Sequence, residues 1–165
     1  MSLIKPAIFS FFALVFNATV ANASEANSIK FDLVPLQLGA YQIKVQLADT
    51  TEKRMQGLMG QNPLQHGLIL LYEEPRLISL WMKNTPSALD VAFIDQNWQI
   101  RQINQMAPFS LKTHQSKEPA IAALEMPLGW FKQHQITIGM QVHYCPAKLQ
   151  YCEKQQAKLQ IISGV

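Results

Sequence analysis

Seven side chains in this sequence could together form a binding or catalytic site: Arg54, Trp81, Lys83, Asn84, Thr85, Asp90 and Glu125. Five of them fall between positions 81 and 90, on a polar bend that is predicted to leave one strand and enter the next. Lys83 would hold an anionic or carbonyl oxygen beside the indole of Trp81, and Asp90 or Glu125 would accept a proton. Two carboxylates and one lysine can support hydrolysis or elimination on a sugar or a peptide.

The same residues also allow a purely architectural role. Lys83 would then pair with Asp90 or Glu125, because a half-buried charge needs a partner. Asn84 and Thr85 would tie the backbone of the bend through side-chain hydrogen bonds. The residues alone therefore leave three readings open: an architectural cluster, a site for a ligand or partner, and a catalytic centre.

Several common kinds of chemistry are missing from the sequence. It has no Gly-x-Ser-x-Gly elbow and no phosphate-binding glycine loop. The four histidines are far apart and lack the spacing of metal ligands, so neither a metal site nor a cofactor is predicted. The formal net charge is +3 and the basic residues are scattered, which argues against a surface for nucleic acid or anionic membranes.

The first 23 residues have the organisation of a cleavable export signal. Lys5 is the only charge, an apolar run spans residues 7–16, and small residues end in an Ala-x-Ala motif at 21–23. The apolar run has about ten residues, whereas a membrane-spanning helix needs roughly 20. Cleavage is predicted after Ala23, so that a chain beginning at Ser24 reaches the periplasm or the medium.

An oxidising compartment would also give the two cysteines a role. Cys145 and Cys152 do not have the spacing of a redox-active Cys-x-x-Cys pair. They are predicted to form a disulfide that closes a short loop and stabilises the fold by roughly 2–3 kcal/mol. A reactive thiol, or a mixed disulfide with a partner, is the alternative.

The predicted mature chain is a succession of short strands. Pro35 lies in the first strand and places it at a sheet edge, because proline donates no ladder hydrogen bond. The second strand alternates perfectly, so Tyr41, Ile43, Val45 and Leu47 are predicted to point inward. The strands are expected at residues 31–38, 41–47, 67–72, 77–82, 90–94, 99–105, 120–126, 141–144 and, in the tail, 159–162.

Two short helices complete the pattern. The first is predicted over 49–59, with Asp49 as its cap and Glu52 completing a capping box. The second would be opened by Pro127 and continue through 130–131. The buried face of the first helix is predicted to consist of Met55, Leu58 and Met59.

The fold class follows from this order of elements. A long alternation of strands and helices is absent, which argues against a parallel sheet. We predict a mainly β, mostly antiparallel, curled or barrel-like sheet of about eight short strands with two short helices. The domain would span residues 31–144, between a flexible segment at 24–30 and a tail at 145–165 that carries the disulfide.

Several runs of residues resemble motifs of one known family. They are Arg54-Met-Gln-Gly-Leu-Met59, Gly67-Leu-Ile-Leu70, Trp81-Met-Lys-Asn-Thr85, Leu89-Asp-Val-Ala-Phe-Ile94, and Ala123-Leu-Glu125 followed by Gly129. They resemble the bacterial and archaeal domain of unknown function 192 (DUF192), over roughly residues 42–142. The resemblance implies a compact, mainly β fold with small helices and frequent export. It implies no known activity.

The chain departs from that family at four positions. Gln61 stands where an arginine is usual, which weakens any model in which that arginine binds an anion. Trp98 replaces the usual glycine of the hairpin turn, where it could be a surface aromatic for a partner or ligand. Leu80 replaces a phenylalanine, and Ala88 a proline.

Three functional hypotheses remain. The leading one is a non-catalytic, exported protein that binds a small polar ligand or an envelope protein at the bend 81–90, near Glu125 and Arg54. The second is a small envelope hydrolase or lyase that uses Asp90 or Glu125 with Lys83. The third is an assembly factor that works through an open sheet edge at 31–38.

Overall fold

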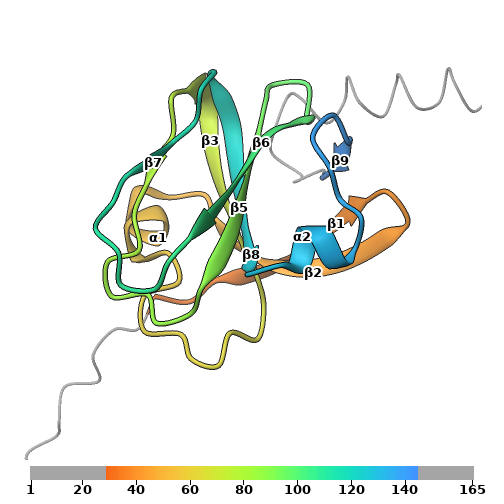
Figure 1. The fold of residues 1–165 in the computed structure, drawn as a ribbon. Helices are drawn as coiled ribbons and strands as arrows, with labels where there is room; N and C mark the ends of the chain where they lie inside the picture. The colour runs from red at the N-terminus through yellow and green to blue at the C-terminus, as the bar shows by residue number, and fades with distance from the viewer. Residues whose placement is uncertain (1–28, 145–165) are drawn as a thin grey trace, which may run out of the picture.

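A computed structural model describes residues 29–144 of the chain. The predicted export signal, the predicted disulfide and the predicted strand at 159–162 lie outside the described residues. The mainly β prediction with two short helices is confirmed (Figure 1). The elements are, in order, β1 (Asp32–Leu38), β2 (Tyr41–Ala48), α1 (Thr51–Gln56), β3 (Leu68–Arg76), β4 (Ser79–Leu80), β5 (Leu89–Ile94), β6 (Ile100–Met106), β7 (His114–Gln115), β8 (Ala120–Pro127), α2 (Trp130–Gln133) and β9 (Val142–His143).

Seven strands form one curled sheet in the order β6-β5-β8-β3-β2-β1-β9, and β4 pairs with β7 separately. Every pair in the large sheet is antiparallel except β2 and β3. Parallel neighbours need a crossover connection, and α1 lies in that connection. A bridge between Gln99 and Gln141 brings the start of β6 beside the start of β9, so the sheet curls back on itself.

The prediction that the first strand lies at a sheet edge is correct for most of the length of β1. Within the described residues, β9 pairs with β1 only at Gln37 and Leu38. The inward pattern predicted for β2 is right at Val45, which is fully buried, but wrong at Tyr41, which is 41 % exposed. Tyr41 lies at the tip of the β1–β2 hairpin, beyond the core, where its ring contacts His134 edge-on at 4.8 Å.

The central strands separate two apolar clusters. In β8, Leu124 and Met126 face the cluster that contains Phe131 of α2. Ala123 faces the other cluster, which contains Leu58 just after α1. Figure 1 shows α1 and α2 on opposite sides of the central strands. A polar side chain on β5 or β8 therefore belongs to one side or to the other.

The cap of α1 differs from the prediction by one residue. Thr50 is the N-cap, and its Oγ1 accepts a hydrogen bond from the Lys53 N–H at 3.2 Å. Asp49 instead forms an ion pair with Lys53 Nζ at 3.3 Å. Thr50 takes the role expected of Asp49 one residue later, so it accepts from the Lys53 N–H and not from the Glu52 N–H that a cap at Asp49 would reach.

The buried face predicted for α1 is correct only at its end. Leu58 is 2 % exposed, whereas Met55 is 72 % exposed. The helix ends at Gln56, and Gly57 has a φ of 49°. This positive φ breaks the helical period, so Leu58 and Met59 turn toward the sheet independently of Met55.

The second helix also begins later than predicted. Pro127 does not open it but ends β8, opposite Leu89 of β5. The Leu128 N–H then donates to the Ala88 carbonyl oxygen at 3.0 Å. Gly129, with a φ of 83°, turns the chain into α2.

The β5–β6 hairpin buries Trp98, so the idea of a surface aromatic there is wrong. Asp95 Oδ1 accepts hydrogen bonds from the N–H groups of Asn97 (2.8 Å) and Gln99 (3.0 Å). Trp98 has a φ of 59° and is 1 % exposed. Its indole packs against the ring of Tyr144, with 5.3 Å between the ring centroids.

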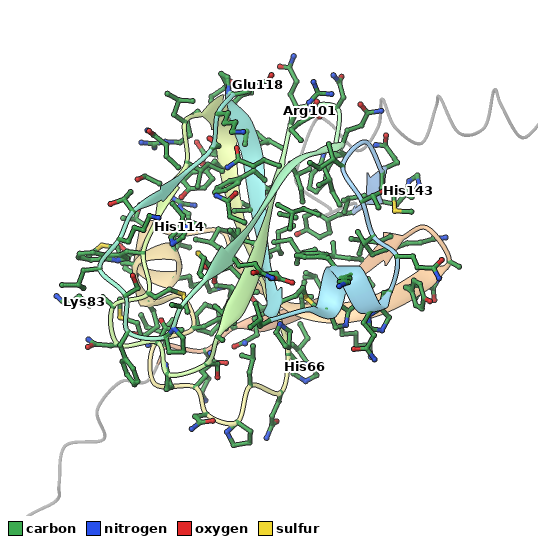
Figure 2. The ribbon with its side chains drawn as sticks, in the orientation of Figure 1. His66, Lys83, Arg101, His114, Glu118 and His143 are labelled. Atoms are coloured by element: carbon green, nitrogen blue, oxygen red, sulfur yellow. The ribbon has the colours of Figure 1, made fainter. Side chains whose placement is uncertain are left out.

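Within residues 29–144, no helix is long and apolar enough to cross a membrane. In the same residues, no three His, Cys, Asp or Glu side chains come together as metal ligands. Figure 2 shows His66, His114 and His143 in separate parts of the fold.

Candidate functional site

A pocket of about 380 Å³ lies between α1, the end of β3 and the segment that contains β4. We call it the α1 pocket. Four of the seven predicted site residues line it, namely Arg54, Trp81, Thr85 and Glu125. Its volume is within the range of pockets that bind small molecules.

Two further lining residues, Tyr72 and Arg76, were missed in the sequence interpretation. Both belong to the second half of β3, which was predicted to end at position 72 but continues to 76. The alternation from Leu68 through Leu70 to Tyr72 places the tyrosine on the Glu125 side of the sheet. That period of two was the signal available in the sequence.

Glu125 is the most unusual side chain of the pocket. It lies in the middle of the sheet, on β8 between Leu68 of β3 and Val91 of β5. It is 6 % exposed, and within the described residues no group donates a hydrogen bond to its carboxylate. Burial alone raises the pKa of Glu125 from 4.5 to about 7. A carboxyl group that titrates near neutrality can donate or accept a proton under ordinary conditions.

Arg54 is held rigidly at one wall of the pocket. Its Nη1 donates to the carbonyl oxygens of Asp49 and Leu71, both at 2.8 Å. Its guanidinium lies 4.7 Å from the ring centroid of Tyr72, and that of Arg76 lies 5.4 Å from the same centroid. Within the described residues neither arginine forms an ion pair, so both charges are available to a ligand.

Tyr72 connects these charges with Glu125. Burial raises the pKa of the Tyr72 hydroxyl, while Arg54 and Arg76 oppose the rise. Glu125 contributes a further small increase to the same pKa. Tyr72 is therefore a half-buried phenol with both guanidinium groups over its ring and with Glu125 close enough to affect its pKa.

In the bend after β4, the side-chain hydrogen bond expected of Thr85 is present, whereas Asn84 contributes through its backbone carbonyl. Thr85 is 5 % exposed, and its Oγ1 donates to the Lys83 carbonyl oxygen at 3.3 Å. Asn84 has a φ of 56°, and its carbonyl oxygen accepts a hydrogen bond from the Gly60 N–H at 2.9 Å. These contacts fix the bend against the loop after α1, with Thr85 also facing the pocket.

Lys83 lies beside the indole of Trp81, as expected, but outside the α1 pocket. It is exposed, lies at the periphery on the α1 side (Figure 2), and does not line the pocket. Its Nζ lies 5.3 Å from the ring centroid of Trp81, which is half-exposed at the rim. Within the described residues Lys83 pairs with no carboxylate, so the predicted pairs with Asp90 and Glu125 are wrong.

Asp90 lies on the other side of the sheet. It is opposite Met126, whereas Glu125 is opposite Val91, and successive residues of a strand point to opposite faces. Its Oδ2 accepts a hydrogen bond from the Gly129 N–H at 2.8 Å, ahead of α2. Burial raises the pKa of Asp90 above its ordinary value, against hydrogen bonds from Gly129 and Gln105. Asp90 and Glu125 therefore cannot act as a pair of catalytic carboxylates.

The family can now be assigned. The model of the family DUF192, described as "Uncharacterized ACR", matches residues 34–144. The chain belongs to the DUF192 family. None of the curated proteins matches it.

Two solved structures are similar to this DUF192 chain. One comes from Sinorhizobium meliloti 1021 and is described as a candidate transcription regulator. It is 29 % identical, with 71 % of this chain and 97 % of that chain covered and a TM-score of 0.68. The other is a protein of unknown function from Novosphingobium aromaticivorans DSM 12444. It is 24 % identical, covers 77 % of this chain and 100 % of its own, and has a TM-score of 0.65, which supports the fold alone.

The structure places three of the four residues at which this chain departs from the usual DUF192 pattern. Leu80 is buried in the cluster on the α1 side, and Trp98 is buried in the cluster on the α2 side. The side-chain amide of Gln61 exchanges two hydrogen bonds with that of Gln46, at 2.8 and 3.0 Å. Gln61 thus faces a second pocket rather than the α1 pocket.

Proposed function

We propose that this DUF192 protein is an exported, single-domain binding protein that holds a small anionic ligand in the α1 pocket. The observation that carries the proposal is Glu125, a buried carboxyl with no hydrogen-bond donor in the described residues. It shares the pocket with Arg54 and Arg76, whose charges are not neutralised there by a carboxylate.

The unpaired polar groups of the α1 pocket favour the binding of an anionic ligand. Burying a polar group without a partner costs about 1–3 kcal/mol, which a ligand can recover by forming the missing hydrogen bond. A guanidinium fits a carboxylate or phosphate through paired N–H groups. Glu125, when protonated, would donate its own hydrogen bond to the same anion, and the Tyr72 hydroxyl would donate another.

The proposed place of action is supported by residues 1–23, which have the pattern of an export signal. We propose the periplasm or the medium, and a ligand that occurs in or beyond the cell envelope. The apolar rim made by Met55, Leu77 and Trp81 would contact the apolar part of this ligand or of an envelope partner. A ligand-binding domain would also suit the regulator role suggested for the similar S. meliloti protein.

A second candidate function is a small envelope hydrolase or lyase, and the pKa of Glu125 is the observation that favours it. A group with a pKa of about 7 is well matched to general acid or base catalysis near neutral pH. In this alternative function, Glu125 acts as the general acid or base, and Arg54 stabilises the negative charge that develops on the substrate. Asp90 and Lys83 have no part in it.

The test is a thermal-shift screen of the protein against inorganic phosphate and small carboxylic acids, at pH 6 and pH 8. We expect at least one anion to raise the Tm of the wild type, because a ligand that binds only the folded state stabilises it. Arg54→Gln should abolish the shift. Arg76→Gln, in which an exposed side chain is changed, should weaken the shift without the risk of unfolding.

The matched control is Arg101→Gln, since Arg101 lies away from the pocket and forms surface ion pairs with Asp95 and Glu118. It should keep the full ligand shift. The proposal fails if no anion changes the Tm of the wild type. It also fails if Arg101→Gln loses the shift as completely as Arg54→Gln.

A further inference from the structure

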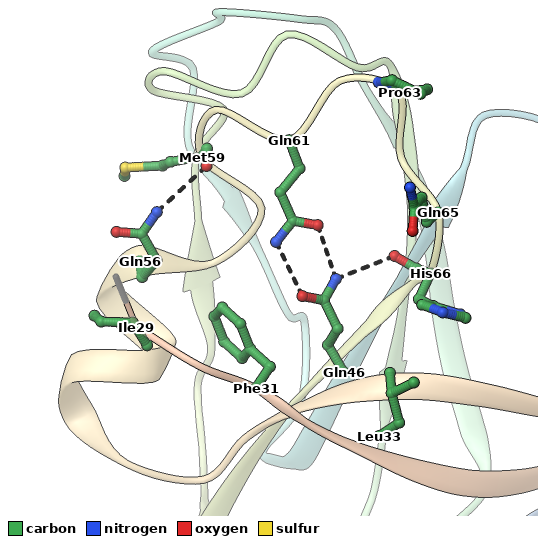
Figure 3. Close-up of a pocket in the computed structure, with 10 residues that line it drawn as sticks. All are labelled: Ile29, Phe31, Leu33, Gln46, Gln56, Met59, Gln61, Pro63, Gln65 and His66. Carbon is green, nitrogen blue, oxygen red and sulfur yellow. Dashed lines mark hydrogen bonds between the residues drawn. The ribbon is translucent and has the colours of Figure 1, made fainter. Parts of the chain in front are cut away.

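A second pocket, of about 620 Å³, lies between β1, β2 and the loop that follows α1 (Figure 3). We call it the amide pocket, because the side-chain amides of Gln46, Gln56, Gln61 and Gln65 all line it. Figure 3 shows Gln61 reaching from the loop toward Gln46 on β2, with Phe31 beside them.

The hydrogen bonds of this pocket are organised but not complete. Gln46 Nε2 donates to Gln61 Oε1 at 2.8 Å and to the His66 carbonyl oxygen at 3.3 Å, which uses both of its hydrogens. Gln61 Nε2 donates one hydrogen to Gln46 Oε1 at 3.0 Å. An amide nitrogen carries two hydrogens, and the second one of Gln61 has no acceptor within residues 29–144, so it can be donated to a ligand.

The chemistry of the amide pocket differs from that of the α1 pocket. Among residues 29–144, no Asp, Glu, Lys or Arg side chain lines it, and His66 is the single ionisable residue there. Its apolar side is formed largely by Phe31 and by Leu33, which is 47 % exposed. Neutral donors and acceptors beside an aromatic ring suit a sugar ring, which presents hydroxyl groups at its edge and C–H groups on its faces.

The two pockets adjoin. Gln56 and Met59 line both of them, on either side of the chain that leaves α1. Gln56 Nε2 donates to the Met59 carbonyl oxygen at 3.3 Å, so these two residues form a common wall. One ligand of moderate size could pass over this wall and reach into both pockets.

We propose that the two pockets are halves of one site and that the ligand is a saccharide that carries a carboxylate. The carboxylate lies in the α1 pocket with Arg54, and the sugar ring lies against Phe31 among the amides of the second pocket. This inference rests on the proposed function for the carboxylate, and adds the sugar and its place.

The experiment uses three probes that divide such a ligand into parts. Lactate supplies the carboxylate, N-acetylglucosamine the sugar, and N-acetylmuramic acid both parts in one molecule. The full chain is expressed with its own N-terminus and purified after any processing, and binding is followed by NMR of its methyl groups. Met55 reports on the α1 pocket, Leu33 on the amide pocket, and Met59 on both.

We expect lactate to shift the Met55 signal and N-acetylglucosamine to shift the Leu33 signal. N-acetylmuramic acid should shift all three signals and bind at least tenfold more tightly than either fragment, because linking two fragments makes the second contact intramolecular. Gln61→Leu should remove the additional affinity that the sugar gives to N-acetylmuramic acid, and it should leave the affinity for lactate unchanged.

Two further variants guard against misfolding and nonspecific effects. Gln65→Leu changes an exposed amide of the same pocket and should weaken the sugar alone. Gln133→Leu makes the same change on α2, outside both pockets, and should alter no affinity.

The outcomes separate this inference from the proposed function. If lactate binds but N-acetylmuramic acid binds no more tightly, the anion site stands and the saccharide inference is overturned. If N-acetylglucosamine binds but neither lactate nor N-acetylmuramic acid shifts the Met55 signal, the two-part ligand is overturned, and the anion screen alone decides the proposed function. If no probe shifts any methyl signal, the saccharide inference is overturned, and the anion screen alone decides the proposed function.

Discussion

The carboxylate of Asp90 accepts a hydrogen bond of 2.8 Å from the backbone N–H of Gly129. This contact ties the start of β5 to the turn that precedes α2, on the face of the sheet away from the α1 pocket. It gives one oxygen of this buried acid a structural role on the side of α2.

Replacing Asp90 should therefore affect stability and not ligand binding. Asp90→Ala leaves the Gly129 N–H without its acceptor and should cost about 1–3 kcal/mol of unfolding free energy. Asp90→Asn keeps an acceptor oxygen and should cost clearly less. Urea denaturation measures both values, and anion binding by folded Asp90→Ala should match the wild type. A loss of binding in a folded Asp90→Ala protein would contradict the assignment.

Glu125 should make the stability depend on pH. Its pKa is about 7 in the folded chain and 4.5 when unperturbed, so the folded state holds the proton more tightly. The contribution of Glu125 to the free energy of unfolding is therefore most favourable below pH 4.5. It declines as the pH rises toward 7. Above pH 7 Glu125 is ionised in the folded state, and the free energy of unfolding is lower by the full amount, up to about 3 kcal/mol.

Glu125→Gln should remove this dependence. We expect the variant to resemble the wild type at pH 5 and to be more stable than the wild type at pH 8. Urea denaturation at both pH values provides the measurement. Glu74→Gln, at an exposed site on β3, is the control and should keep the pH dependence of the wild type. Equal pH profiles for wild type and Glu125→Gln would show that Glu125 titrates normally.

Gly67 allows the loop after α1 to enter β3 close to β8. A Cβ atom at this position would collide with Met126 Sδ and would lie 2.6 Å from the Glu125 carbonyl oxygen. The oxygen belongs to the backbone of a central strand and cannot move away easily. Gly67→Ala should therefore cost about 3 kcal/mol.

Gly60→Ala is the matched comparison for Gly67→Ala. Gly60 has a φ of 74°, but a Cβ there would meet nothing within 4 Å. The backbone strain alone should cost about 1–2 kcal/mol. Thermal unfolding compares the two variants, and an equal or larger loss for Gly60→Ala would contradict the packing argument.

The amides of Gln46 and Gln61 should be energetically coupled. A double-mutant cycle with Gln46→Leu and Gln61→Leu should give an interaction free energy of about 1 kcal/mol, since two neutral hydrogen bonds join the side chains at the surface of a pocket. Unfolding in urea gives the four values. Additive losses would show that the two amides do not hold each other in solution.

Local pattern was sufficient to predict most of the elements. Alternation of apolar and polar residues located β2, and the apolar run before position 72 located β3, because a strand repeats every two residues. Prediction failed where single residues decide a boundary. Thr50 rather than Asp49 caps α1, and Pro127 ends β8 rather than opening α2.

The sequence by itself determined that this is a mainly β domain with two short helices, and that a polar bend follows position 81. The tertiary structure alone decided which of two acids lines the pocket. The register that places Asp90 opposite Met126 brings one acid to α2 and leaves Glu125 on the side of α1. The physical reason is that register and sheet order depend on contacts between distant segments, which no local spacing records.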